Sequence, residues 1–487
     1  MATSVTKPEA VGLPGVRAAL VRRALPLCVV AATAVALRLI YHPYLNYDAR
    51  YALLWAHDVW HGATPDYGAD FAPTPHPLST AVSSLALPFG NGADDIVIWI
   101  VLLSFGVLVW LVYRLGAELF SPAVGAVTAL VVLTRPALER DALLAYQDVP
   151  FAALVVWAVL LEARRPRRGL PVVVVLAVAG LLRPEAWLLA GAYVLYLWRD
   201  ASTHERLRLA GVAALAPAIW AVSDLIVSGD LLHSLHGTAD LAEAQDRRRS
   251  IPSVPYWTAK YFAFTLREPL VVGVPIGVAF AWRYRRRSAA LLLAVAAVMT
   301  AIFAVGPVFG LPLIARYIRT PAVVLAVFFG VGVLGWRLLP DGRERRRWAA
   351  AAALALAVLI AFLPKNVDML DGIHDRLARD SRLYDDLQNV GEAPPVRAAF
   401  ATCGEASTSE HRPIPHLRWW LDAPPESVGT VEDRASPLAG LYVTPRPTPA
   451  VRQFYRENFP HVPAPAGYRL LYENRSWRVY AAPRCSA

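Results

Sequence analysis

An aspartate at position 48 stands where the chain leaves its first apolar run and enters a polar stretch. Residues 49–60 repeat large apolar side chains at helical spacing, which is typical of a helix lying in a membrane interface. A carboxylate at the start of such a helix can cap it by accepting backbone hydrogen bonds. It can also act as a general base that takes the proton of a hydroxyl group. The residue types alone leave both roles open for Asp48.

Two histidines four residues apart, His57 and His61, have the spacing of the zinc-binding motif HExxH. The acid that follows the first of them is Asp58, which is one methylene shorter than Glu, and the sequence offers no third ligand. We therefore expect no metal. A glycine-rich phosphate loop, a nucleophile-elbow serine and a Cys–His pair are also missing from the sequence, so we expect no cofactor and no nucleotide hydrolysis or acyl transfer.

The composition of the chain predicts membrane helices around these residues. Of the 487 residues, 56 % are hydrophobic and 18 % are charged, whereas soluble domains are roughly a quarter charged. A membrane core ~30 Å thick needs ~20 apolar helical residues. The first apolar run continues to Tyr41 without a small-residue cleavage site, so we expect a span and not a cleaved signal peptide. We interpret eleven runs as spans: 24–43, 95–113, 122–138, 148–163, 170–182, 186–198, 208–227, 269–283, 289–306, 319–338 and 348–364.

The arginines between these runs predict the orientation of the chain. They cluster at 22–23, 164–168, 283–287 and 343–347, all on one side of the membrane if residues 169–198 form two helices. Positively charged loops stay in the cytoplasm. This places the N-terminus inside and the loops 44–94 and 228–268 outside. The formal net charge is +10, but its arginines lie in short clusters between apolar runs, so we expect no nucleic-acid partner.

The tail from residue 365 onward is polar and rich in proline. The sequence therefore predicts an all-α multi-pass protein of the cell membrane, residues 1–364, followed by a small extracytoplasmic α/β domain, residues 365–487. In the tail we expect a helix over 367–389, strands at 396–402, 417–421 and 441–444, and a hairpin of 468–472 with 477–480. Cys403 and Cys485 lie in polar sequence, where they can form a disulfide or remain free thiols.

Several short motifs follow one another in an order that resembles the GT-C superfamily of polyprenyl-phosphate-dependent glycosyltransferases, such as protein O-mannosyltransferases and lipid A aminoarabinose transferases. The matching segments are Arg38 with Asp48, Thr74-Pro75-His76-Pro77-Leu78, Tyr146-Gln147-Asp148-Val149-Pro150-Phe151, Leu182-Arg183-Pro184-Glu185 and Ala315-Arg316-Tyr317. The resemblance covers about residues 35–340. It departs at Ala49, where many relatives have Glu, so any second carboxylate of this loop lies elsewhere or is absent.

The resemblance implies transfer of a sugar from polyprenyl phosphate to an acceptor hydroxyl with inversion. One carboxylate must take the proton of the acceptor on the face opposite the leaving phosphate, and we assign this role to Asp48. An arginine fork can stabilise the leaving phosphate. Arg316 and Arg319 lie at an outer surface where arginine is normally depleted, and Arg316 is the favoured phosphate ligand. The alternative is that both snorkel to the interface or contact lipid.

Asp148 stands at the mouth of the fourth span, where a carboxylate is costly unless it faces a cavity. Under the resemblance it positions the acceptor or the donor sugar. The alternative is an ion pair with Arg140 or Arg135.

Arg183, Glu185 and His76 are the remaining candidates for substrate binding. Arg183 and Glu185 can satisfy each other at the turn between two short helices, and that turn would open on the same cavity. His76 belongs to the matched proline-rich segment. A basic run at 247–249 either grips an anionic group or forms a solvated helix face.

The predicted function is transfer of one sugar to an envelope glycan or lipid, with the lipid-phosphate donor, the acceptor and membrane lipids as partners. The arginine-rich composition and residues 403–421 resemble actinobacterial members, which implies mannose or arabinofuranose as the sugar. Two alternatives stay open. A transporter or flippase of a lipid-linked saccharide would need the same groove and arginines, but no carboxylate. A non-catalytic scaffold would bind its partners through the tail, and Asp48 would then tolerate replacement by Asn.

Overall fold

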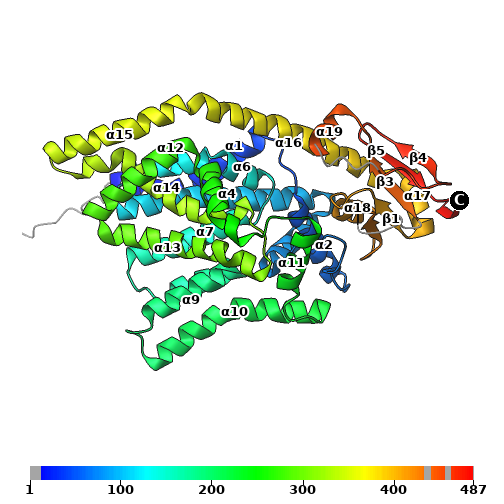
Figure 1. The fold of residues 1–487 in the computed structure, drawn as a ribbon, viewed down its shortest axis with the longest axis horizontal. Helices are drawn as coiled ribbons and strands as arrows, with labels where there is room; N and C mark the ends of the chain where they lie inside the picture. The colour runs from blue at the N-terminus through cyan, green and yellow to red at the C-terminus, as the bar shows by residue number, and fades with distance from the viewer. Residues whose placement is uncertain (1–12, 433–439, 456–461, 486–487) are drawn as a thin grey trace, which may run out of the picture.

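Most of the computed structural model is helical, and the structure describes residues 13–432, 440–455 and 462–485. Each of the eleven apolar runs overlaps a helix (Figure 1). These helices are α1 (Leu13–Ile40), α4 (Ala93–Leu119), α5 (Pro122–Leu133), α7 (Asp148–Arg164), α8 (Leu170–Gly180), α9 (Glu185–Leu197), α10 (Thr203–Ser228), α12 (Val254–Tyr284), α13 (Arg286–Val305), α14 (Arg319–Leu334) and α15 (Arg343–Ala361). Residues 169–198 thus form two helices, α8 and α9.

Length and hydropathy decide how many of these helices can cross a membrane. Among the described residues, four helical segments are long and apolar enough to cross a membrane. The number rises to seven if each bent pair of helices is counted as one span. Two such pairs are α5 with α6 (Pro136–Leu143), bent by 61°, and α15 with α16 (Leu363–Glu392), bent by 42°. The apolar helices α8 and α9 are shorter. The fold is that of a multi-pass membrane protein, and the number of eleven spans stays a prediction.

Helix α14 lies at the centre of the helical body. Within the segment Ala315–Leu338, 89 % of an apolar stretch of 18 residues is buried. Helix α12 packs closely on α14 because glycine lies at their contact: a Cβ atom at Gly277 would lie 1.7 Å from the carbonyl oxygen of Phe328. This packing fixes the segment that precedes α14, which contains Arg316.

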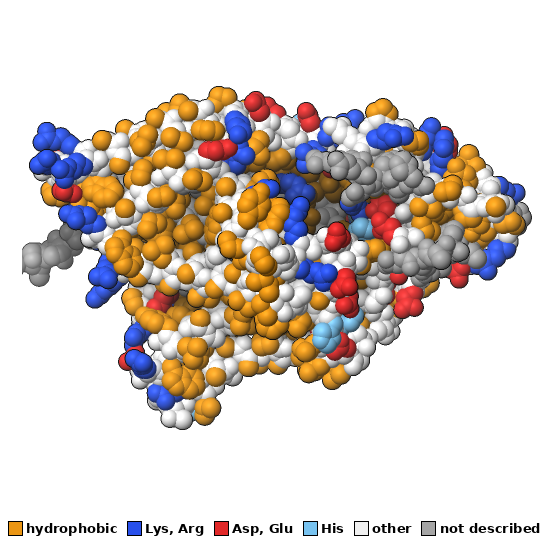
Figure 2. All heavy atoms as spheres, viewed as in Figure 1, with side chains coloured by type: hydrophobic (Ala, Val, Ile, Leu, Met, Phe, Trp, Pro, Cys, Tyr) orange, Lys and Arg blue, Asp and Glu red, His pale blue; other side chains and the backbone are white. Residues whose placement is uncertain are grey.

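The two ends of the helical body differ in charge. The arginine clusters at 164–168, 283–287 and 343–347 lie at the end of α7, between α12 and α13, and at the start of α15. Asp148 begins α7 and Arg316 precedes α14, so both lie at the opposite helix ends. Figure 2 shows basic side chains gathered at the end of the body that lies away from the C-terminal domain.

We expect an impermeant maleimide to label Cys at position 475, but not Cys at position 341, on intact cells. Arg475 is exposed in the tail, and the side chain of Asp341 is 94 % exposed at the arginine-rich end. Each Cys would be introduced in a chain whose exposed Cys28 is replaced by Ala. Labelling of both positions from outside would contradict the predicted orientation.

The tail continues through the long helix α16 to a small sheet at the far end of the molecule (Figure 1). Five strands of the described residues form this sheet in the order β2-β1-β3-β5-β4. Strand β1 (Ala406–Thr408) runs parallel to β2 (Val428–Thr430) and β3 (Leu441–Pro445). Strand β5 (Trp477–Ala481) is antiparallel to β3 and β4 (Arg469–Glu473). The expected helix, hairpin and strand at 441–444 are therefore present.

Two segments that were expected to be strands are helices. Residues 396–402 lie in α17 (Pro394–Cys403), and residues 417–420 lie in α18 (Ile414–Trp420). Both helices carry proline in the first turn. Proline is tolerated there because the backbone N–H groups of the first turn have no hydrogen-bond partner within the helix. Gly404, with a φ of +73°, ends α17. Proline and glycine thus outweighed the apolar patterns of these runs.

The loop 44–94 and the tail share one hydrophobic core. Tyr51 and Trp55 of α2 (Tyr47–Trp60) pack in the same cluster as Leu417 and Trp477 of the tail. The fully buried Arg418 contacts the carboxylates of two loop residues, Asp58 and Asp66, at 2.7 Å each. The tail therefore holds the helix that carries Asp48.

We expect the melting temperature to fall between about pH 4 and pH 6, and Asp58→Asn to reduce that fall. Burial raises the pKa of Asp58 to about 6, although Arg418 opposes the shift. The unfolded chain releases this proton near pH ~4, so stability is lost as the pH rises through the folded pKa. Thermal unfolding across this range measures the slope. Equal slopes in both proteins would show that Asp58 does not set it.

We expect Cys403 and Cys485 to be linked in the C-terminal domain. In the structure they form a disulfide whose Cα atoms lie 5.2 Å apart, 82 residues apart in sequence. Closing a loop of this length is worth roughly 4 kcal/mol in the chain-entropy model. Peptide maps of the tail should differ between reducing and non-reducing conditions. Identical maps would refute the pairing.

Candidate active site

Asp48 lies in the first turn of α2, but Asn46 caps the helix. The Asn46 side-chain oxygen accepts hydrogen bonds from the backbone N–H groups of Asp48 and Ala49, at 2.7 and 3.1 Å. Its amide nitrogen donates to the carbonyl of Leu144. The capping role considered for Asp48 therefore belongs to Asn46, and the Asp48 carboxylate is left for other contacts.

Arg316 connects the two predicted carboxylates. It lies in the turn Ala315–Ile318 before α14, and its Nη1 is 2.8 Å from Asp48 Oδ2 and 3.6 Å from Asp148 Oδ2. Its guanidinium lies over the ring of Tyr146, 4.3 Å from the centroid. Asp48 and Arg316 each keep a quarter of the side chain exposed, whereas Asp148 is 3 % exposed. Arg316 thus stands between a buried and an accessible carboxylate.

Arg183 contacts two carboxylates, those of Asp148 and Glu185. It donates to Asp148, and its Nη2 is 2.6 Å from Glu185 Oε1. Its guanidinium also lies over the ring of Tyr317 at 4.5 Å. Arg183 and Glu185 therefore do pair at the turn, but the pair also reaches Asp148. The partners of Asp148 are Arg183 and Arg316, not the nearby arginines considered from the sequence.

Arg319 does not join this group. It is buried in the first turn of α14, where Nε contacts Asp141 at 2.8 Å and Nη1 donates to Thr265 at 2.6 Å. It is absent from the lining of the cavity described below. These contacts tie α14 to α6 and α12, so they explain Arg319 as a structural residue.

His76 precedes α3 (Pro77–Ser83) and lies on the cavity wall. Its ring packs edge-on against Trp220, with centroids 5.3 Å apart. Burial, together with the positive charge of Arg183, lowers the pKa of His76 to about 3. The ring is therefore neutral at physiological pH and can both donate and accept a hydrogen bond.

These side chains open on a cavity of about 1440 Å³. Its polar part includes Asp48, His76, Arg183, Glu185 and Arg316. The flank formed by α10, α11 (His233–Ala244) and α13 is mainly apolar, with Pro217, Trp220, Leu235, Met299, Ile302 and Phe303, and its polar members include Asp224, Ser234 and Thr238. Figure 2 shows the surface hollowed between the helical body and the C-terminal domain, with acidic and basic side chains at the rim. The cavity suits a ligand with an apolar chain and an anionic head.

Asp48 is ionised in this setting. Burial raises the pKa of its carboxyl, but the charge and hydrogen bond of Arg316 lower it more, and the charge of Arg247 adds to the effect. The net pKa lies below the ordinary value of an aspartate. An ionised carboxylate is the form that a general base requires.

Comparisons with known proteins agree with this architecture. Residues 77–224 match the family model of dolichyl-phosphate-mannose-protein mannosyltransferase. A crystal structure of ArnT from Cupriavidus metallidurans bound to undecaprenyl phosphate matches with a TM-score of 0.59 and 15 % identity, over 94 % of this chain and 97 % of that one. The predicted likeness to GT-C glycosyltransferases is confirmed at the level of the fold.

A second GT-C structure shows a more distant likeness. It is the oligosaccharyltransferase AglB from Archaeoglobus fulgidus in complex with an inhibitory peptide and a dolichol-phosphate. The TM-score is 0.50 at 13 % identity, over 83 % of this chain and 64 % of that one. No curated protein matches the chain in sequence. At these identities the likeness establishes the fold.

Within this GT-C fold, the basic run at 247–249 separates into three roles. Arg247 lines the cavity near Asp48 and forms no ion pair with a described residue. Arg248 lies over the ring of Trp257 at 4.2 Å, and Arg249 pairs with Glu243 at 3.2 Å. The basic run in the sequence indicated a segment that reaches the cavity, but only the structure shows that Arg247 is the arginine of this run that lines it.

The tail also contributes cavity residues that no motif in the sequence indicates. Glu410, His411, Arg412 and Glu432 line the cavity on the side of the C-terminal domain. The one available signal was the mixed string Glu410-His411-Arg412 after a short strand. A binding cavity walled partly by the tail was not expected from a tail treated as a separate domain.

Proposed function

We propose that this protein is a membrane glycosyltransferase that transfers one sugar from a polyprenyl-phosphate donor to a cell-envelope glycan or lipid outside the cytoplasm. The proposal rests on one observation: the ionised Asp48 contacts Arg316 at the polar part of a cavity whose other flank is apolar. A lipid-linked phosphate needs both parts, because its tail requires an apolar groove and its head requires fixed positive charge. Two proteins of similar fold hold such lipids, undecaprenyl phosphate and dolichol-phosphate.

In the proposed reaction, Asp48 takes the proton of the acceptor hydroxyl while the hydroxyl oxygen attacks C1 of the sugar. The bond between C1 and the phosphate oxygen breaks, and its electron pair leaves with polyprenyl phosphate. Attack on the face opposite the phosphate inverts the anomeric centre. Arg316 and Arg247 stabilise the charge that develops on the leaving phosphate.

Binding of the donor would also strengthen the base. Arg316 keeps the pKa of Asp48 low in the free protein. A phosphate at Arg316 offsets part of that positive charge, so the pKa of Asp48 rises when the donor is present. Asp48 then accepts a proton more readily in the complex than in the free protein.

Asp148, Arg183 and Glu185 are positioning residues in this proposal. Asp148 is buried between Arg183 and Arg316, and its Oδ2 lies 3.6 Å from the same Nη1 of Arg316 that contacts Asp48. The charges of these three residues orient the guanidinium of Arg316, which binds the phosphate, and the three residues do not contact the reacting atoms. His76, neutral and on the cavity wall, supplies a hydrogen bond to a sugar hydroxyl.

The test is transfer by the purified protein in lipid vesicles, with polyprenyl-phosphate donors that carry labelled mannose or arabinofuranose. These two sugars are proposed on the resemblance alone. We expect labelled sugar to appear on an acceptor while polyprenyl phosphate is released. Movement of intact donor across the bilayer without cleavage would identify a transporter and overturn the proposal.

A further inference from the structure

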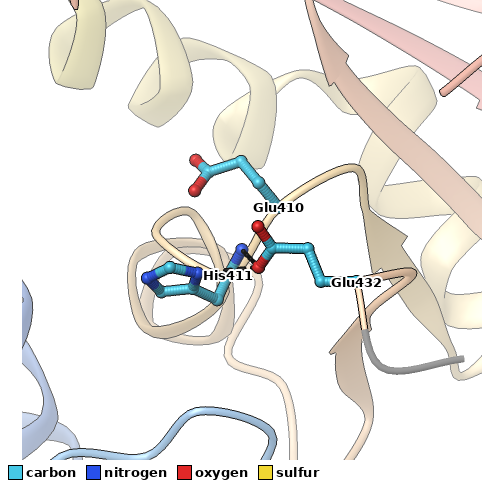
Figure 3. A group of neighbouring side chains, drawn as sticks. All are labelled: Glu410, His411 and Glu432. Atoms are coloured by element: carbon cyan, nitrogen blue, oxygen red, sulfur yellow. Dashed lines mark hydrogen bonds and ion pairs between the residues drawn. The ribbon is translucent and has the colours of Figure 1, made fainter. Parts of the chain in front are cut away.

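Three potential metal ligands meet on the cavity wall formed by the C-terminal domain. Strands β1 and β2 are parallel neighbours. Glu410 and His411 follow the carboxyl end of β1, and Glu432 follows that of β2. Parallel strands end at the same edge of a sheet, so residues that follow them come together there. Figure 3 shows the three side chains around one small space, and one ligand atom of each lies within 4.8 Å of the others.

Neighbouring groups hold these side chains in place. Tyr455 donates to Glu410 Oε1 at 2.7 Å, and the backbone N–H of Arg412 donates to Oε2 at 3.0 Å. Each carboxylate oxygen has a second lone pair that these bonds leave free. The His411 ring stacks on Phe71 with centroids 4.7 Å apart. Such outer contacts orient the ligands of metal sites.

His411 has one ring nitrogen for a ligand role and one for support. Its Nδ1 lies 2.7 Å from Glu432 Oε2, and its Nε2 lies 3.4 Å from the side-chain amide of Gln245 in the outer loop. If Nδ1 binds a cation, its proton leaves. Nε2–H can then donate to the amide oxygen of Gln245, whose two ends exchange by a half turn.

We propose that Glu410, His411 and Glu432 bind one divalent transition-metal cation, with Zn²⁺ or Mn²⁺ as the fitting class. Two carboxylates and one imidazole favour such ions, because Ca²⁺ and Mg²⁺ prefer sites made of oxygen alone. Typical Zn²⁺ ligand distances are ~2.0–2.2 Å, so the cation must insert between His411 Nδ1 and Glu432 Oε2, which lie 2.7 Å apart without it, while the Glu410 carboxylate turns toward them. All three residues line the cavity, so the remaining coordination positions face it.

The test is binding of Zn²⁺ alone to the full-length protein in detergent after treatment with a chelator. We expect one saturable equivalent by equilibrium dialysis with elemental analysis, and a rise in melting temperature when Zn²⁺ is added. His411→Ala and Glu432→Gln should each weaken binding at least ~10-fold and remove that rise. The assay needs no donor or acceptor, so its outcome is independent of the proposed transfer reaction.

His236→Ala is the matched control. His236 also pairs with a carboxylate, Asp230, at 2.7 Å, but it has no third ligand in the described part of the chain. Its loss should leave Zn²⁺ binding unchanged. Wild-type affinity in both His411→Ala and Glu432→Gln, or binding that is lost in His57→Ala instead, would overturn the proposal. If His411→Ala does not fold, Glu432→Gln decides the question, because it keeps size and polarity.

Discussion

Replacing Asp48 with Asn is expected to lower the rate of sugar transfer at least ~10²-fold while donor binding survives. Asn keeps the size of the side chain but cannot take the proton of the acceptor. The carboxylate also competes with the donor phosphate for Arg316, at 2.8 Å. Removing its charge should therefore leave the donor affinity unchanged or increase it. Transfer and lipid-donor binding must be measured separately, because their opposite responses distinguish a base from a phosphate ligand.

Asp95→Asn is the matched control for this substitution. Asp95 belongs to the same side of the protein, pairs with Arg38 at 3.0 Å, and has 58 % of its side chain exposed outside the cavity. Its replacement should leave transfer at the wild-type rate. If Asp48→Asn also transfers sugar at that rate, the base is another residue, with Asp148 next in line, or the protein is not a transferase.

The sequence was sufficient for the helical body because each helix carries its own signal. Long apolar runs locate the apolar part of each helix, although α12 begins at Val254 and the predicted run only at 269. The candidate residues stand at the ends of these helices, so the motifs could be found without knowing how the helices pack. Asp48 and Arg316 are 268 residues apart, and their contact follows from the packing of α14 in the centre.

Side-chain direction could not be predicted in the same way. Arg316 and Arg319 are three residues apart in one segment, and both seemed suited to bind phosphate. The chain passes from a 3₁₀ turn into α14 between them, and the packing of α14 buries Arg319 against Asp141 while Arg316 faces the cavity. Burial of one and exposure of the other depend on helices far away in sequence.

The tail was the least predictable part because its strands are short. Strands β1 and β2 have three residues each, too few to show an alternating pattern. Their pairing, which brings Glu410 and Glu432 together, is decided by contacts distant in sequence. The core shared with α2 likewise depends on aromatic residues that looked like an interfacial helix face.

Replacing Arg316 with Ala is expected to weaken donor binding and turnover together, each by at least ~10-fold, and transfer efficiency by ~10² or more. Arg316 would contact the phosphate both before and during departure, so both states lose stabilisation. Its loss also leaves Asp48 without its nearest cation and Asp148 with Arg183 alone. Arg316→Lys keeps the charge but not the planar fork, so it should recover only part of the donor affinity.

Arg249→Ala is the control for Arg316→Ala, because Arg249 is a cation of the segment between α11 and α12 that pairs with Glu243 and does not line the cavity. It should leave donor binding unchanged, whereas Arg247→Ala should weaken it. A donor affinity that is unchanged in Arg316→Ala would place the phosphate elsewhere, even if turnover falls. In that case the contact at 2.8 Å would serve to orient Asp48, and Arg247, which has no ion-pair partner among the described residues, would be the remaining phosphate ligand of the cavity near Asp48.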